Sequence, residues 1–224
     1  MKLTGFAFGI RTVKSFSIED KLGAIVDEVL YSEGSEFHEK LFTDVRENHN
    51  TKILFDPIRL NKFTITPRDF IFEWNVKSDF KKEFNHYLSN YVDIITKRVF
   101  KEFKIKNISR FGLLIRAELQ EKDQLLNDVS EIIRKHKGID DSLSLRFNVV
   151  TKKPLKLSKI VTEDYDNEIV TYDKPNKDSP LSISVDYQKY FNPELNIIED
   201  ATQDFQTFCL KALEAYNETY KDSK

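Results

Sequence analysis

The sequence predicts an α+β protein made of two similar halves, each built from a strand, a short helix, antiparallel strands and a long helix. In some segments apolar residues alternate with polar or small residues, which is the period of a strand with one buried face. In others they recur every three or four residues, the period of an amphipathic helix. These segments follow a similar order in residues 1–106 and 107–224. We therefore expect one compact unit, in which the halves share a curved antiparallel sheet covered by helices on one face.

The first half opens with a strand that ends near Val13. Over residues 6–10 its aromatic and aliphatic side chains alternate with smaller ones, as expected for a strand that buries one face. Gly5 and Gly9 lie within this strand. Glycine inside a strand indicates curvature or close packing of the backbone, and we assign both residues that role.

A helix is expected over residues 18–31, where apolar residues recur at helical spacing. Ser17 and Asp20 precede this stripe and resemble a capping box. The following segment, 32–50, has mixed polarity. We expect it to be a loop that carries a short helix over 37–45.

Three antiparallel strands follow from Thr51, with Pro57 and Pro67 in the turns between them. A long helix is then expected over 79–103, with Ser78 as its N-cap, because a broad apolar stripe recurs at helical spacing.

The second half repeats this plan. A strand is expected over 108–119, followed by a helix over 122–137 that stops at Gly138. Further strands and a final helix are then expected over 142–153, 156–162, 167–173, 181–189 and 199–221.

The two halves also share some residues when the first helix is moved by 103 positions along the chain. This shift superposes Asp20 on Asp123, Leu22 on Leu125, Val26 on Val129, Glu28 on Glu131, and Val29-Leu30 on Ile132-Ile133. Each helix also follows a strand that contains glycine, apolar residues and arginine, with Arg11 and Arg116 in comparable places. Internal duplication and chance similarity of amphipathic helices both account for this pattern.

The order of elements resembles the TATA-binding-protein-like architecture, in which two such halves share one curved sheet with the long helices on one face. The resemblance covers most of the chain and implies the architecture alone. TATA-binding proteins insert paired phenylalanines into the DNA minor groove from a strongly basic concave sheet, and this chain lacks that overall charge.

A more local resemblance covers residues 70–119 and 181–213. These parts of the chain are similar to a sporadically distributed, uncharacterised bacterial family of comparable length, and that likeness implies no mechanism. The segments that carry it are Phe72-Glu73-Trp74 with the long helix after it, Arg110-Phe111-Gly112-Leu113-Leu114-Ile115-Arg116, and Leu181-Ser182-Ile183-Ser184-Val185-Asp186-Tyr187.

The composition excludes several classes of protein. A formal charge of −2 and a pI near 6.1 provide no overall attraction to nucleic acid or to anionic lipid, so any polyanion site has to be local. Cys209 is the single cysteine and cannot form an intrachain disulfide, which favours a reducing compartment. No apolar run approaches the roughly 20 residues that span a bilayer. We expect a cytoplasmic protein that does not associate with membranes.

Catalytic and metal-binding motifs are missing. His38, His49, His86 and His136 are scattered singly, without the short spacing typical of zinc ligands. No Gly-x-Ser-x-Gly elbow and no glycine-rich phosphate loop is present. The sequence therefore predicts no catalytic residue, no metal and no cofactor.

Two groups of charged residues are candidate sites. The first is a basic segment, which could contact nucleic acid or another polyanion. Its residues are Lys97, Arg98, Lys101, Lys104, Lys106 and Arg110, and Glu102 is the single acid that lies between them. Helix-dipole compensation alone explains its first three members.

The second group is a sheet cleft made of Arg11, Arg116 and Asp186. Asp186 interrupts an apolar strand, and a buried carboxylate needs a partner that either arginine on a neighbouring strand could supply.

These observations lead to a function hypothesis with two alternatives. We expect a non-enzymatic bacterial binding or adaptor protein, an accessory component of a larger system, that contacts a protein partner. The first alternative is a nucleic-acid-binding protein that uses the basic segment. The second is an enzyme with a carboxylate and arginine site in the sheet cleft.

Overall fold

The protein was analysed as a computed structural model, which describes residues 1–13, 16–37, 42, 44–48, 50–120, 122–135, 145–154, 165–176, 179–195 and 198–221. The strands are β1 (Lys2–Thr12), β2 (Asp44–Asn48), β3 (Thr51–Asp56), β4 (Asn61–Ile65), β5 (Asp69–Asn75), β6 (Ile108–Glu118), β7 (Leu145–Pro154), β8 (Tyr165–Lys174) and β9 (Ser182–Leu195). The helices are α1 (Phe16–Glu19), α2 (Leu22–Tyr31), α3 (Phe80–Tyr91), α4 (Phe100–Glu102), α5 (Gln124–Lys135) and α6 (Ile198–Tyr216), and the π-helical segments are η1 (Val92–Val99) and η2 (Asn217–Lys221).

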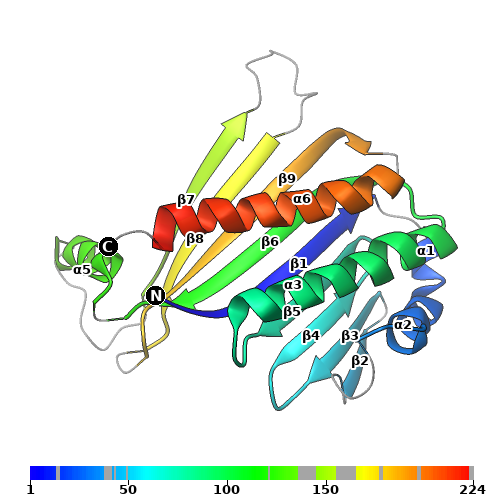
Figure 1. The fold of residues 1–224 in the computed structure, drawn as a ribbon, viewed down its shortest axis with the longest axis horizontal. Coiled ribbons are helices and arrows are strands. Elements are labelled where there is room, and N and C mark those ends of the chain that lie inside the picture. Colours follow the sequence, from blue (N-terminus) through cyan, green and yellow to red (C-terminus); the bar gives the residue numbers. More distant parts are fainter. Residues whose placement is uncertain are drawn as a thin grey trace.

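The strands of the described residues form one open antiparallel sheet of nine strands, in the order β2-β3-β4-β5-β1-β6-β9-β8-β7 (Figure 1). The first strand of each half pairs with the last strand of the same half, β1 with β5 and β6 with β9. The two first strands then pair with each other at the centre. The predicted fold class, α+β with a shared antiparallel sheet, is confirmed.

The central ladder shows how the halves are related. Gly9 of β1 lies directly opposite Gly112 of β6. These residues are 103 positions apart, the same shift that superposes the helix of one half on that of the other.

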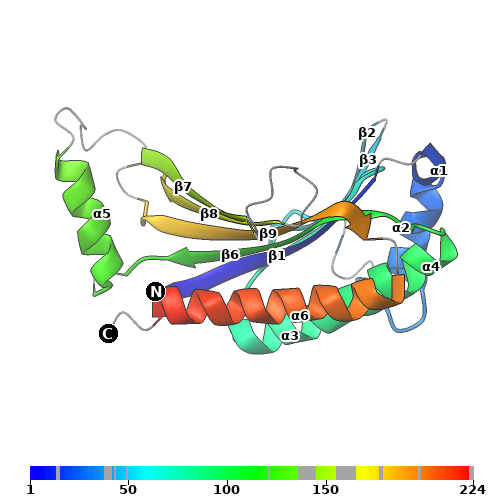
Figure 2. The same cartoon turned by 90° about the horizontal axis from the view of Figure 1, so that it is seen from above.

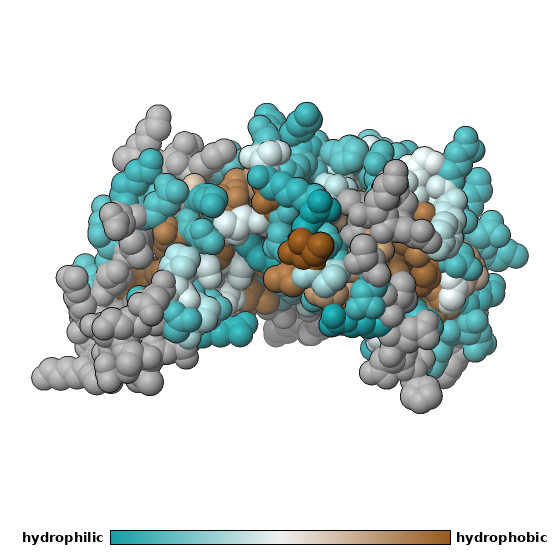
Figure 3. Space-filling view, turned by 90° about the horizontal axis from the view of Figure 1, so that it is seen from below, coloured by the Kyte–Doolittle hydropathy of each residue, from teal (hydrophilic) through white to brown (hydrophobic). Residues whose placement is uncertain are grey.

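The long helices cover one face of the sheet (Figure 2). Phe6, Phe8 and Ile10 of β1 point toward these helices and are buried, as their alternation predicts. The edges of the sheet bend away from α3 and α6, so that the opposite face is concave (Figure 2). The space-filling view shows this hollow as an arch (Figure 3).

An aromatic core joins the two halves. Phe205 of α6 is buried, and its ring centroid lies 6.5 Å from that of Phe8, 5.4 Å from that of Tyr91 and 5.1 Å from that of Phe111. The first two of these partners belong to residues 1–106 and the third to residues 107–224. The halves thus share a core as well as a sheet.

The first half differs from the sequence prediction in two places. The helix expected over 18–31 is broken into α1 and α2, because the chain turns at Asp20 and Lys21, where the Lys21 N–H donates to the Ile18 carbonyl. Most of the short helix expected over 37–45 lies outside the described residues, and the expectation is wrong at its end, where β2 begins. Strand β2 is stabilised by its antiparallel ladder with β3, the next strand along the chain, and its polar sequence does not reveal this pairing.

The long helix was predicted closely. It runs through α3, η1 and α4, and its N-cap is Asp79 in place of Ser78, since the Asp79 carboxylate accepts a hydrogen bond from the Lys82 N–H at 2.8 Å. The strand β6 and the helix α6 also lie where expected. Gly138 and the strand expected over 156–162 lie outside the described residues.

Glu83 connects the start of α3 to the end of β5. Its carboxylate accepts hydrogen bonds from Trp74 Nε1 at 2.6 Å, from the Ser78 N–H at 2.8 Å and from the Ser78 hydroxyl at 2.9 Å. Burial raises the pKa of Glu83, but the hydrogen bonds from Trp74, Ser78 and Lys77 lower it more, so that the pKa lies below its ordinary value.

This pKa predicts a loss of stability in acid. The folded-state pKa of Glu83 is lower than the unfolded value of about 4.3, so its contribution is present above that pH and disappears as the pH falls through the folded pKa. Glu83→Gln should lower the free energy of unfolding by about 1–2 kcal/mol at neutral pH and reduce its acid dependence. Urea unfolding at a series of pH values measures both effects. The exposed Glu102→Gln is the control, and an equal change in that variant would contradict the assignment.

Candidate functional site

The concave face of the sheet carries the charged side chains of the central strands. Positions that alternate with the buried apolar residues place Arg11 of β1, Asp69 and Glu73 of β5, and Arg110 and Arg116 of β6 on this face. No helix of the described residues lies over it (Figure 2). We therefore treat this face as the candidate site.

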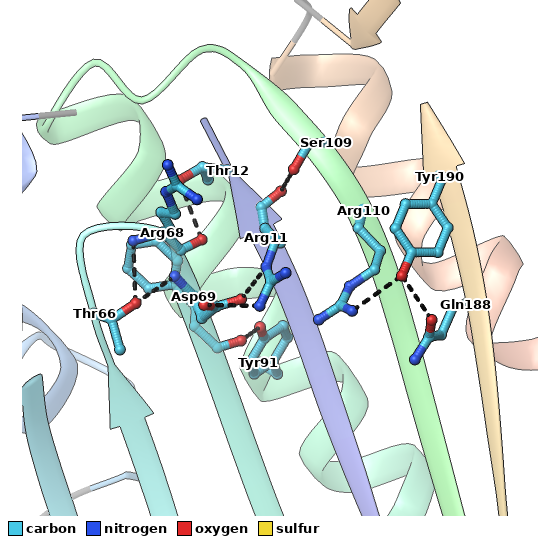
Figure 4. Close-up of polar contacts among 11 residues, drawn as sticks. Arg11, Thr12, Thr66, Arg68, Asp69, Tyr91, Ser109, Arg110, Gln188 and Tyr190 are labelled. Carbon is cyan, nitrogen blue, oxygen red and sulfur yellow. Dashed lines mark hydrogen bonds and ion pairs between the residues drawn. The ribbon is translucent and has the colours of Figure 1, made fainter. Parts of the chain in front are cut away.

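Arg11 forms a two-point ion pair with Asp69. Its Nε lies 2.7 Å from Asp69 Oδ1, and its Nη2 donates to Asp69 Oδ2 at 3.2 Å (Figure 4). Asp69 is positioned by a tight turn, in which its N–H donates to the Thr66 hydroxyl at 2.8 Å. The hydrogen bond with Asp69 raises the pKa of Arg11. Arg11 is therefore a paired cation.

Arg116 takes part in a second ionic group. Its Nη2 lies 2.6 Å from Glu73 Oε2, and Lys62 Nζ lies 2.7 Å from Glu73 Oε1. Arg116 and Glu73 come from strands on opposite sides of β1, and they meet because Gly5 and Ala7 present almost no side chain between them. The small residues of β1 thus determine which charges can pair.

A hydrogen-bonded chain runs along β6 and β9. Arg110 Nη1 donates to the Tyr190 hydroxyl at 3.3 Å, and this hydroxyl donates to Gln188 Oε1 at 2.8 Å (Figure 4). Gln188 Nε2 donates in turn to Asp186 Oδ2. The ring of Tyr165 stacks on Tyr190 with centroids 4.5 Å apart. This series of hydrogen bonds links the guanidinium of Arg110 to the carboxylate of Asp186 through two neutral side chains.

Asp186 is a partly buried carboxylate of this face. Burial raises its pKa, while the hydrogen bond from Gln188 and the charge of Arg110 lower it by less. The expected pairing of Asp186 with Arg11 or Arg116 is wrong, since both arginines pair with other carboxylates. All three predicted cleft residues do reach the same face of the sheet.

A depression of about 190 Å³ lies at the centre of the concave face, over the paired residues Gly9 and Gly112. Gly9 and Gly112 form part of its lining because neither carries a side chain. Ile71 and Leu114 add apolar surface. The charged and polar side chains that line it are Asp69, Glu73, Arg110, Asp186 and Gln188.

The sequence analysis missed Asp69, Glu73, Gln188 and Tyr190. A detectable signal was present in β5, where residues 69, 71, 73 and 75 alternate with Phe70, Phe72 and Trp74. The acids of that strand therefore had to lie on the face opposite the core.

The basic segment does not form one surface. Lys97 and Arg98 are exposed on η1, and Lys101 is exposed on α4, which belong to the long helix that covers the other face of the sheet. Arg110 lies on the concave face, so the sheet separates it from those three residues.

The remaining members of the basic segment lie between α4 and β6, and both are exposed. Lys104 has a positive φ of 53° and ends the helix, with its N–H donating to the Lys101 carbonyl and the Ile105 N–H donating to the Phe100 carbonyl. This is a Schellman motif, so local backbone geometry accounts for the turn at Lys104. Lys106 follows the turn directly.

Among the described residues, no group of three or more His, Cys, Asp or Glu side chains is arranged to hold a metal ion. Cys209 is buried in the core, and burial raises the pKa of its thiol. His38, His49 and His136 lie outside the described residues. No helix in the described part of the chain is both long and apolar enough to cross a bilayer.

A second cavity of about 420 Å³ lies on the helical side, between α6 and the strands β8 and β9. Its lining is mixed, with Phe111, Phe208 and Ala212 beside Glu168 and Lys211. The Tyr220 hydroxyl donates to Glu168 Oε1 at 3.2 Å.

No family model, no curated protein and no solved structure matches this chain.

Proposed function

We propose that this protein is a non-enzymatic binding protein that presents the concave face of its sheet to a protein partner. The observation that carries the proposal is the structure of this face. Its charges are held in place by pairs such as Arg11–Asp69 and Arg116–Glu73, and in the described residues no helix covers it. A face of mixed, positioned charges suits specific protein recognition, in which electrostatic complementarity selects the partner.

The charge of the concave face favours protein over nucleic acid. The carboxylates of Asp69 and Glu73 on β5 and of Asp186 on β9 flank the arginines of β1 and β6, so a phosphate backbone would meet repulsion as well as attraction. The basic segment is also divided between the two sides of the sheet. Nucleic-acid binding through residues 97–106 on the helical side is the alternative, and it predicts salt-dependent binding that charge reversal at Lys101 weakens.

Site-specific photocrosslinking in the native host tests the proposal. A photoreactive amino acid at Ile71, on the concave face, should give one defined protein adduct. The same amino acid at Ile58, which is 87% exposed in the turn between β3 and β4, is the matched control. The purified adduct partner should then bind the isolated protein, and Lys62→Glu should weaken that binding roughly tenfold or more.

Two results would contradict the proposal. Adducts of equal yield at Ile71 and Ile58 would show that the concave face is not the interface. An adduct at Ile71 that nuclease treatment removes would replace the protein partner by a nucleic acid.

A further inference from the structure

Two arginines face each other at the centre of the sheet. Arg11 of β1 and Arg110 of β6 are direct partners in the antiparallel ladder, and both side chains lie on the concave face (Figure 4). Like charges directly opposite each other across two strands destabilise a sheet. Nearby negative charge reduces this repulsion.

The two arginines differ in how their positive charges are compensated. Asp69 binds Arg11 through two hydrogen bonds. Arg110 instead donates to the neutral hydroxyl of Tyr190 and forms no ion pair with a carboxylate of the described residues. Asp186 is close enough for its pKa to be lowered by Arg110, yet its carboxylate is hydrogen-bonded to Gln188. Arg110 therefore lacks a direct anionic partner among the described residues.

Arg110 also lines the depression over Gly9 and Gly112. A guanidinium has five N–H donors in a planar fork, and the Tyr190 hydroxyl uses one of them. The volume of about 190 Å³ is sufficient for one side chain, with Ile71 and Leu114 beside its aliphatic part. The depression thus combines available donors with a shape that accepts a single inserted residue.

We infer that this depression receives an aspartate or glutamate side chain of the protein partner, whose carboxylate binds Arg110. The inference rests on the proposed function and specifies the chemistry of the partner. An arginine and a carboxylate form a planar pair with two parallel hydrogen bonds. A carboxylate with a single negative charge fits better than a doubly charged phosphate, because Asp69, Glu73 and Asp186 line the same depression and repel additional negative charge.

The experiment uses a hexaglutamate peptide as the probe and follows the side-chain Nε–Hε signals of the arginines by NMR, which detects weak binding. Hexaglutamate should shift the Arg110 signal in a saturable way, whereas hexaglutamine and hexalysine should not. Arg110→Gln should weaken binding by roughly tenfold or more. Arg146→Gln is the matched control, since Arg146 is exposed on the edge strand β7 and lies outside the depression.

Folding is controlled for in two ways. Arg110→Gln removes the like-charge contact with Arg11, so it should leave the unfolding midpoint unchanged or raise it. A second variant, Gly9→Val, fills the depression without touching any charge. The nearest side-chain atom to a Cβ at Gly9 is Ile71 Cγ1 at 3.8 Å, which leaves room for a side chain. Gly9→Val should also weaken hexaglutamate binding.

Several outcomes would overturn the inference. The first is that hexaglutamate gives no saturable shift of the Arg110 signal. The second is that Arg110→Gln and Arg146→Gln lose affinity for hexaglutamate equally. The third is that a single-stranded oligonucleotide binds Arg110 more tightly than hexaglutamate does. If Arg110→Gln still captures the protein crosslinked at Ile71 with unchanged affinity, the inference fails while the proposed function stands. If no partner is crosslinked at Ile71, the proposed function fails independently of the peptide result.

Discussion

Replacing Phe8 with alanine is expected to lower the free energy of unfolding by about 3–5 kcal/mol. Phe8 is fully buried at the centre of the sheet, and its ring centroid lies 5.2 Å from that of Phe84 and 5.7 Å from that of Tyr91. It also contacts Phe205 of the second half. The substitution therefore leaves a cavity among residues that both halves contribute, where neither half can close it alone.

Equilibrium urea unfolding measures this loss, and the chain offers one natural probe in each half. Trp74, the single tryptophan, reports on the first half by its fluorescence, and Cys209, the single cysteine, reports on the second when unfolding exposes its thiol to a labelling reagent. Both probes should give the same midpoint in the wild type and in Phe8→Ala, because the halves share a sheet and a core. Separate midpoints would contradict a single cooperative unit.

A peripheral phenylalanine provides the comparison for Phe8. Phe147 of β7 is partly buried and stacks on Tyr172 at 4.6 Å, near the edge of the sheet. Phe147→Ala should lower the free energy of unfolding clearly less than Phe8→Ala does, since fewer neighbouring residues lose contact. Equal costs would show that the centre of the sheet is not the main source of stability.

Gly5→Ala is expected to lower the free energy of unfolding by about 1–3 kcal/mol, through steric overlap with the neighbouring strand. A Cβ at residue 5 would lie 2.7 Å from the backbone carbonyl oxygen of Trp74. Trp74 belongs to the β1–β5 ladder, so its backbone cannot move away without disturbing hydrogen bonds between these strands, and the overlap cannot be relieved cheaply.

Gly9→Ala in the same strand is the matched control. A Cβ there meets no atom closer than 3.8 Å, and alanine loses less conformational entropy on folding than glycine does. Its effect on the free energy of unfolding should therefore be less than about 1 kcal/mol. Thermal unfolding of both variants measures the difference. A Gly9→Ala variant destabilised as much as Gly5→Ala would contradict the steric explanation.

The elements that the sequence predicted well are those whose signal is local. In β1, β6 and the helix that continues from α3 to α4, apolar residues repeat at one period over ten or more positions, so burial on a single face determines the element. The misses lie where pairing between neighbouring strands outweighs the apolar pattern within one segment. Strand β2 exists through its pairing with β3, and Ile58 and Leu60, expected within a strand, are exposed in the turn that reverses the chain.

The candidate site was predicted in part for the same reason. Alternation is a local property, and it placed Arg11, Arg116 and Asp186 on a sheet surface, which the structure shows to be a common face. Their partners depend on which strands become neighbours. Arg11 meets Asp69 across 58 residues of sequence, and Arg116 meets Glu73 across 43. Contacts at such separation leave no periodic signal in the chain.

The sequence by itself determined the fold class and most of the order of elements, because these follow from short-range periodicity. Only the tertiary structure decided the order of strands, the curvature and the register. Register is what placed Gly9 opposite Gly112 and Arg11 opposite Arg110. A shift of one residue in the pairing would move every side chain of a strand to the opposite face of the sheet. The register is therefore selected by burial of the apolar face, to which the whole sheet contributes. The register in turn determines which charges meet on the concave face.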